Sequence, residues 1–146
     1  MLIWGKHLET GNPDIDLEHK EIFTRLNAIG DAIERRVDPE TLTELIVVLL
    51  DYSYLHFHRE EHAMACAGCP LHDRNCNAHR VFVERLQNWL AVINDEAMPV
   101  SMIQDIYTET CRWIQTHIEN IDGGLRRRGA DADKPGSTRA TSPVNA

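Results

Sequence analysis

The sequence predicts an all-α fold, an up-down-up-down antiparallel four-helix bundle with an N-terminal arm and a disordered C-terminal tail. Apolar residues recur at three- and four-residue steps in four segments of roughly 20 to 26 residues each. Short stretches that contain Pro or Gly separate these segments, and none shows the strict alternation typical of a half-buried strand. A chain of 146 residues with 42% hydrophobic content suits one domain with a single core.

The first two helices have clear limits in the sequence. The first is predicted from about Asp14 to Arg36, with an apolar stripe at helical spacing. Asp38 followed by Pro39 is typical of an N-cap residue and a proline at the first helical position. We therefore predict that the second helix begins there and continues to Met64.

The third helix follows a break at Gly68 and Pro70. Its stripe starts with Asn75 and ends with Ile93, and includes polar as well as apolar residues. Because proline and glycine interrupt helices, this break separates the third helix from the second.

The fourth helix is predicted to open at Pro99 and to stop at the pair Gly123-Gly124. Residues 1–125 would then form the bundle domain. Residues 126–146 are polar and show no apolar period, so we expect a disordered tail or linker there.

The charge distribution excludes some classes of partner. The net charge is −8, but residues 123–146 carry five Lys/Arg against two Asp/Glu, so residues 1–122 carry ten against 21. Such an acidic body argues against a nucleic acid or a membrane as partner, because both reward clustered basic residues. The first residues lack a signal-peptide pattern, and no apolar run is long enough to cross a bilayer. We expect a cytoplasmic protein.

Six residues of the kinds that ligate iron fall on the apolar faces of the predicted helices. They are His19, His56, Glu60, His79, His117 and Asp122. A solitary His or carboxylate costs free energy to bury, so six such residues on four facing helices favour a shared metal site. His56 and Glu60 are four apart, which puts them on one side of a helix about 6 Å apart along its axis.

The spacing of His117 and Asp122 is irregular. The two are five residues apart, which on an ideal α-helix corresponds to a rotation of about 140°. We expect them to converge only if the Asp122 side chain reaches around the helix or the helix carries a local π-bulge.

Two segments resemble the motifs of a known family. Residues 56–64 read HFHREEHAM and fit H-F-x-x-E-E-x-x-M, while residues 113–122 read WIQTHIENID and fit W-x-x-x-H-I-x-x-x-D. With Trp4 near the start, and Ile15-Asp16 then His19 in the first helix, the chain resembles a bacterial hemerythrin over residues 4 to about 122. The resemblance implies a four-helix bundle with a non-haem diiron centre that binds O2 reversibly.

The resemblance also implies ligand roles. These are His19 and His56 for one iron, His79 and His117 for the other, and Glu60 and Asp122 as bridges beside an oxo or hydroxo group. The iron with two His would keep an open position for O2. Four apolar residues resemble the lining of the family's O2 pocket, although ordinary core packing would explain them equally well: Ile22, Phe57, Trp113 and Ile114. Such a dry pocket would suit O2 or NO.

Asn75 stands where the family has a further His ligand. We interpret it either as a weak oxygen ligand or as a neighbour of the ligands, with water or an open position on the second iron. Fewer nitrogen donors should shift the redox potential, so we predict a centre that oxidises faster than a storage protein tolerates. His72 could replace the missing ligand only if the first turn of the third helix unwound, because it lies about 10.5 Å from His79 along the axis.

Three cysteines crowd between the second and third helices, at Cys66, Cys69 and Cys76. Reduced thiols are the interpretation that we favour. A thiol redox switch and a zinc knuckle remain alternatives, although a C-x-x-C with one further cysteine lacks the second pair of a usual zinc site.

Two classes of function remain open. We favour a non-enzymatic module that senses O2, redox state or NO through a labile diiron centre and acts on a signalling partner or a fused output domain. The alternatives are a diiron enzyme that consumes O2, peroxide or NO, and an oxygen carrier or storage protein. The sequence offers no dedicated acid–base pair outside the ligand set, which favours binding over catalysis.

Overall fold

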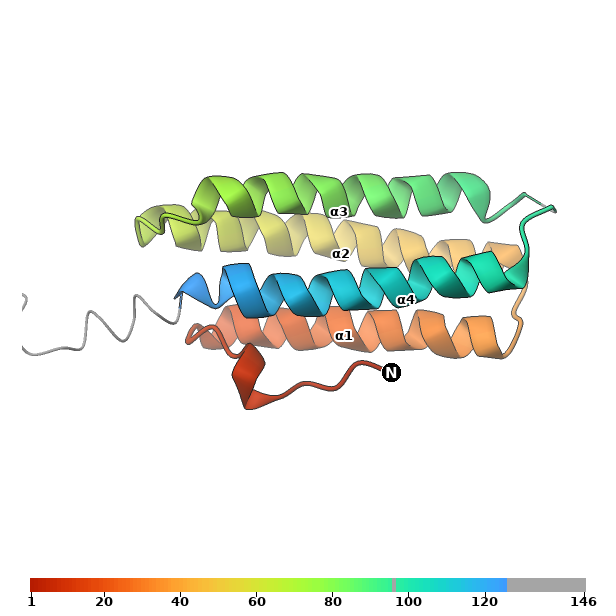
Figure 1. The fold of residues 1–146 in the computed structure, drawn as a ribbon, viewed down its shortest axis with the longest axis horizontal. Helices are drawn as coiled ribbons and strands as arrows, with labels where there is room; N and C mark the ends of the chain where they lie inside the picture. The colour runs from red at the N-terminus through yellow and green to blue at the C-terminus, as the bar shows by residue number, and fades with distance from the viewer. Residues whose placement is uncertain (96, 126–146) are drawn as a thin grey trace, which may run out of the picture.

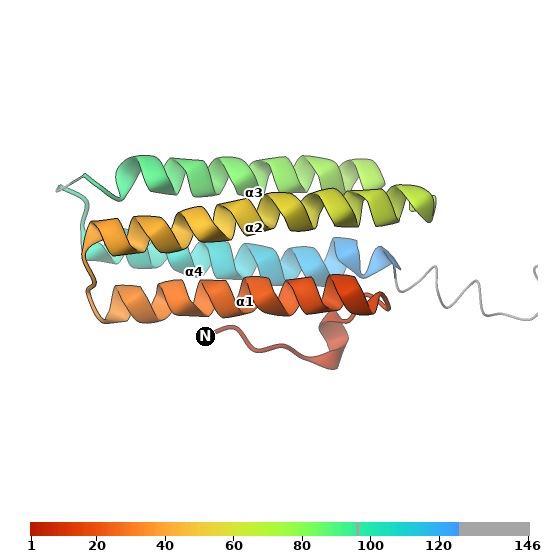
Figure 2. The ribbon, with the colours of Figure 1, turned by 180° about the vertical axis from the view of Figure 1, so that it is seen from behind.

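The computed structural model describes residues 1–95 and 97–125, and it shows an antiparallel four-helix bundle (Figure 1). Its elements are the 3-10 helix η1 (Lys6–Leu8), the α-helices α1 (Pro13–Glu34), α2 (Pro39–Cys66), α3 (His72–Val92) and α4 (Val100–His117), and the π-helix η2 (Ile118–Asp122). Successive helices run in opposite directions, and the N-terminal arm extends beside α1 (Figure 2). The predicted fold class is confirmed. The predicted disordered tail, residues 126–146, lies outside the described residues.

The first two helices begin as the sequence predicts, with a cap and a proline. The Asn12 side chain accepts hydrogen bonds from the backbone N–H groups of Asp14 and Ile15, and Pro13 is the first residue of α1. Asp38 accepts from the Thr41 backbone N–H at 2.9 Å ahead of Pro39. Such caps satisfy backbone donors that the first helical turn leaves unpaired.

A large apolar core fills most of the bundle. Its fully buried side chains include Ile22, Leu26 and Ile29 of α1, Ile46 and Leu49 of α2, Phe82, Leu86 and Trp89 of α3, and Ile114 of α4. A smaller apolar cluster of Met64, Cys69 and Ile121 lies toward the other end of the bundle. The residues between these clusters along α2, α3 and α4 include polar side chains, so a polar layer separates two apolar ones.

The N-terminal arm packs on α1. The Asn27 side chain accepts a hydrogen bond from the Leu2 backbone N–H at 2.7 Å and donates one to the Leu2 carbonyl at 2.9 Å. This anchor places the Trp4 ring 5.6 Å from Phe23 and 6.1 Å from the His19 ring. The arm therefore covers one side of the polar layer. Across the described residues, no helix combines the length with the apolar composition that a membrane crossing requires.

Replacing Leu49 tests the face that α2 presents to the core. Leu49 is fully buried, so Leu49→Ala should lower the free energy of unfolding by about 3 kcal/mol, through lost burial and the cavity left behind. The neighbouring Val48 is 48% exposed, and Val48→Ala should cost less than about 1 kcal/mol. Urea denaturation at equal metal loading measures both. Equal losses for the two variants would contradict this packing of α2.

Candidate metal centre

The six ligand-type residues predicted from the sequence meet in the polar layer. His19 comes from α1, His56 and Glu60 from α2, His79 from α3, His117 from the end of α4, and Asp122 from the end of η2. None is more than 5% exposed. They form two groups that share Glu60, namely His19, His56 and Glu60, and Glu60, His79, His117 and Asp122.

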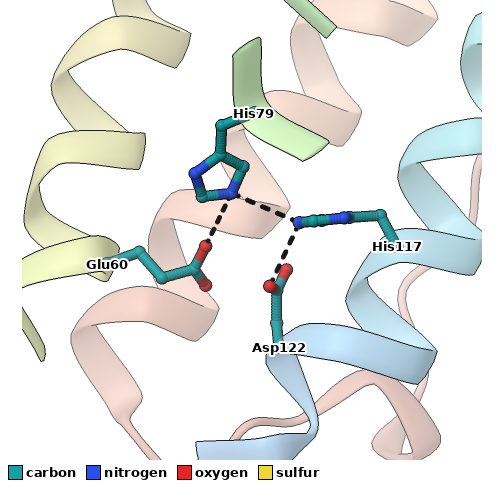
Figure 3. A group of neighbouring side chains, drawn as sticks. All are labelled: Glu60, His79, His117 and Asp122. Atoms are coloured by element: carbon teal, nitrogen blue, oxygen red, sulfur yellow. Dashed lines mark hydrogen bonds and ion pairs between the residues drawn. The ribbon is translucent and has the colours of Figure 1, made fainter. Parts of the chain in front are cut away.

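Glu60 faces both groups at once. Its Oε2 lies 3.2 Å from His79 Nε2, as Figure 3 shows. Its Oε1 lies 3.3 Å from His19 Nε2. The carboxylate therefore presents one oxygen to each side of the centre. A carboxylate in this position can bridge two cations.

Asp122 is placed in the same way. Its Oδ1 lies 3.2 Å from His117 Nε2, and its Oδ2 lies 3.4 Å from His19 Nε2. Figure 3 shows His117 between His79 and Asp122, with the His79 and His117 Nε2 atoms 3.2 Å apart. Glu60 and Asp122 therefore each contact His19 with one oxygen and an imidazole of the other group with the second oxygen.

The π-helix η2 brings Asp122 to this position. The Gly123 backbone N–H donates to the Ile118 carbonyl at 3.0 Å, five residues back. In such a turn, residues five apart come to the same side of the helix, whereas an α-helix would separate them. Of the two routes that the sequence left open, the structure shows the π-helical one. Gly123 fits here because a Cβ would lie 2.9 Å from the Glu119 carbonyl oxygen.

Buried atoms without partners show that the centre suits cations. Eleven buried side-chain atoms of the described residues lack hydrogen-bond partners, and five of them point into the centre: His19 Nε2, His56 Nε2, Glu60 Oε1, and Asp122 Oδ1 and Oδ2. An unpaired buried polar atom costs free energy, and a bound cation would satisfy all five. Metal–ligand bonds of about 2.1 Å place neighbouring ligand atoms about 3.0 to 3.4 Å apart, close to the separations described above. The side chains therefore fit a pair of metal ions.

The charges of the two carboxylates dominate the electrostatics. Burial lowers the pKa of His19, but the close carboxylates of Asp122 and Glu60 and their negative charges outweigh it and raise the pKa to about 10. Burial raises the pKa of Glu60, yet its contacts with His19 and His79 and the positive charges of His19 and His56 hold it well below its usual value. The centre is thus an anionic site that attracts positive charge, whether protons or metal ions.

Two further carboxylates hold imidazole rings from outside the centre. Glu18 Oε2 lies 2.8 Å from His56 Nδ1, and Glu61 Oε1 lies 2.8 Å from His79 Nδ1. A carboxylate on Nδ1 fixes the tautomer that leaves Nε2 free to bind metal. Arg59 pairs with Glu18 in turn. Sequence reasoning missed both roles, because each carboxylate contacts a His on another helix and no spacing within one helix reveals that.

Aromatic rings hold two of the imidazoles. Phe57 stacks on His79 with ring centroids 3.8 Å apart, and Trp113 stacks on His117 at 4.7 Å. Each of these aromatics lines a surface cavity beside the centre, Phe57 between α2 and α3 and Trp113 between α3 and α4. The other two predicted pocket residues, Ile22 and Ile114, are buried in the apolar core and line neither cavity.

Asn75 is fully buried next to Glu60. Its Nδ2 donates to Glu60 Oε2 and to Met64 Sδ, both at 3.2 Å. Because both neighbours are acceptors, the amide nitrogen faces them, and Oδ1 has no partner among the described residues. The side chain therefore supplies a hydrogen bond to Glu60 where the hemerythrin resemblance implies an imidazole. His72 lies outside both groups, with its ring next to Asp73 and Cys76.

The cysteines are not part of the ligand set. All four are free thiols, and none belongs to either group of ligand-type side chains. Cys66 Sγ lies 3.5 Å from His62 Nε2, while Cys69 is buried in the small apolar cluster. Nothing in this arrangement resembles a zinc knuckle, since the thiols of Cys66, Cys69 and Cys76 form no common ligand set among the described residues.

Comparisons with known proteins agree with this geometry. A family model described as the hemerythrin HHE cation binding domain matches residues 10–127. A bacteriohemerythrin of Pseudomonas paraeruginosa is 28% identical over 123 residues, covering 84% of this chain and 78% of the relative. A bacteriohemerythrin of Clostridium acetobutylicum is 26% identical, with 84% and 96% covered, and a hemerythrin subunit alpha of Lingula anatina is 22% identical, with 82% and 87% covered.

Neutralising Glu61 tests its role in orienting His79. Glu61→Gln keeps the size of the side chain but weakens the acceptor for His79 Nδ1–H, so metal affinity should fall about 10- to 100-fold. Competition with a coloured chelator measures the affinity. Glu44→Gln is the matched control, because Glu44 is an exposed residue of the same helix. Equal affinities for the two variants would show that the Glu61 contact is unimportant.

Proposed function

Because the chain belongs to the hemerythrin HHE cation-binding family, we propose that it is a non-haem diiron protein that binds O2 or NO. The observation that carries the proposal is the placement of Glu60 and Asp122, each with one carboxylate oxygen toward His19 and the other toward His79 or His117. Two bridging carboxylates between clusters of imidazoles suit two iron ions. An oxo or hydroxo group would complete the bridge, as the hemerythrin resemblance implies.

The side chains divide between the two ions. His19 and His56 would hold one iron, and His79 and His117 the other, while the carboxylates serve both. When bound, the pair of irons would supply a redox-active centre with room for a small ligand. Glu18 and Glu61 would keep the imidazoles of His56 and His79 oriented throughout, which a rigid ligand set requires.

The surroundings of the centre favour small neutral ligands. Trp4 covers His19 from the N-terminal arm, and the rings of Phe57 and Trp113 shield the imidazoles of His79 and His117. These rings limit the contact of the three imidazoles with water. O2 and NO are small and uncharged, so they lose little hydration when they enter such a site.

Asn75 supports a sensing role over storage. Its amide nitrogen faces Glu60, so the side of His79 and His117 has two imidazoles where the hemerythrin resemblance implies three. Fewer nitrogen donors alter the redox potential and make oxidation of the reduced centre easier. We infer that the protein reports O2, redox state or NO, and that it passes the signal to a partner or to a fused output domain.

An enzyme that consumes O2, peroxide or NO is the second candidate. The observation in its favour is a pair of surface cavities, of about 450 and 680 Å³, that reach His79 and His117 respectively. Such access to ligands of the second iron could let substrates and products exchange during turnover.

Exposure of the reduced, iron-loaded protein to O2 tests the proposal. We expect two irons per chain and conversion to the oxidised form within minutes. Asn75→His should slow this conversion about tenfold, because it restores an imidazole to the second iron. Asn77→His is the matched control, since Asn77 is an exposed residue of the same helix. Optical spectra and iron analysis provide the measurements.

The outcomes separate the candidate functions. One iron per chain, or zinc in place of iron, would overturn the diiron proposal. An O2 adduct of the unaltered protein that persists for hours would contradict the labile centre and favour storage. Repeated consumption of O2 with a reductant, instead of one conversion per protein, would favour the enzyme.

A further inference from the structure

A basic groove runs between α3 and α4 next to the metal centre. It is a cavity of about 680 Å³, and we call it the arginine groove. Its defining residues are Arg74, Arg85, Glu109, Arg112, Trp113 and His117. The groove therefore reaches from the surface to one of the imidazoles of the proposed second iron site.

The groove carries positive charge on an acidic protein. It has three arginines against one carboxylate, while the whole chain has a net charge of −8. Arg85 and Glu109 are 3.7 Å apart at the surface, a weak contact. Within residues 1–95 and 97–125, Arg74 and Arg112 have no ion-pair partner. Two guanidinium groups are therefore free to attract an anion.

The other approach to the centre lacks this charge. The cavity between α2 and α3 reaches His79, but its lining has one arginine, Arg80, which pairs with Glu84, and one carboxylate, Glu61. A third cavity, over α1 and α2, has three acidic residues against two arginines. Positive charge is thus concentrated on the approach to His117.

The side chains available in the groove favour a compact anion over an aromatic one. Trp113 already stacks on Phe82, at 4.8 Å, and on His117, at 4.7 Å, so neither contact is left for stacking on an aromatic ligand. Guanidinium groups and the Thr116 side chain remain to recognise a ligand. Guanidinium groups bind compact oxyanions and similar ions well.

We propose that the arginine groove steers small inorganic anions, such as nitrite or azide, to the His117 side of the centre. The proposal rests on the proposed function, because the anion would end at the iron for which Asn75 supplies no imidazole. The groove would thus admit anions, which the apolar rings around His19 and His79 do not favour. A charged cleft raises the local concentration of its counter-ion and speeds its association.

Azide binding to the full-length, oxidised, iron-loaded protein tests the groove. The double variant Arg74→Gln/Arg112→Gln should bind azide about tenfold more slowly at low ionic strength. At about 0.5 M salt the difference should shrink to less than about twofold, because salt screens exposed charges. Association of the neutral ligand NO with the reduced protein should be unchanged. Stopped-flow absorbance measures each rate constant.

Arg80→Gln is the matched control for the route. Arg80 is an exposed arginine of α3 that pairs with Glu84 and lines the cavity between α2 and α3. Its loss should leave the azide rate unchanged. Slower azide association in Arg80→Gln, with no effect of the double variant, would overturn the proposal. It would show that azide enters through the cavity at His79.

A second measurement separates failure of the groove from failure of the diiron proposal. Because Trp113 lines the groove, iodide should quench the tryptophan fluorescence less in the double variant than in the unaltered protein, while the neutral quencher acrylamide should act equally in both proteins. Unchanged azide rates and unchanged iodide quenching would overturn the groove while leaving the diiron centre intact. An unaltered protein that shows no azide spectrum, yet shows the iodide difference, would overturn the diiron proposal and keep an anion groove without a metal target.

Discussion

The structure depends on the burial of two carboxylates and four imidazoles that have too few partners in the protein. Glu60 and Asp122 are fully buried, and both offer oxygens that no hydrogen bond satisfies among the described residues. Burying such groups alone would cost several kcal/mol each. Cations between them turn this cost into a stabilising interaction, so folding and metal binding are coupled. The bundle supplies the rigid frame that keeps the ligands in place when they converge.

Each local feature of the fold contributes to that convergence. The caps at Asn12 and Asp38 fix where α1 and α2 begin, and apolar clusters lie on both sides of the polar layer. The π-helical turn before Gly123 rotates Asp122 into the centre at the expense of regular α-helical hydrogen bonding. Outside the ligands, Glu18 and Glu61 orient the rings. The same arrangement leaves room for chemistry, because Asn75 contacts Glu60 without adding an imidazole.

Much of this could be predicted from the sequence, because helical spacing projects directly onto the faces of a bundle. The four helices follow from their stripes and from Pro39, and the pair His56 and Glu60 follows from its four-residue step. Spacing could not decide between the two routes for Asp122, since a π-turn depends on packing around Ile118 and Ile121. It also could not reveal contacts between helices, such as Glu18 with His56, or the side to which the Asn75 amide turns. Those depend on the relative rotation of neighbouring helices, which no single helix encodes.

The proposed centre has one iron ion on each side of the Glu60 carboxylate. A crystal of the iron-loaded protein, measured at the iron absorption edge, locates the ions without reference to any activity. We expect two anomalous peaks, one bounded by His19 and His56 and the other by His79 and His117, with Glu60 and Asp122 between them. A single peak, or a peak at the cysteines near His62, would contradict it.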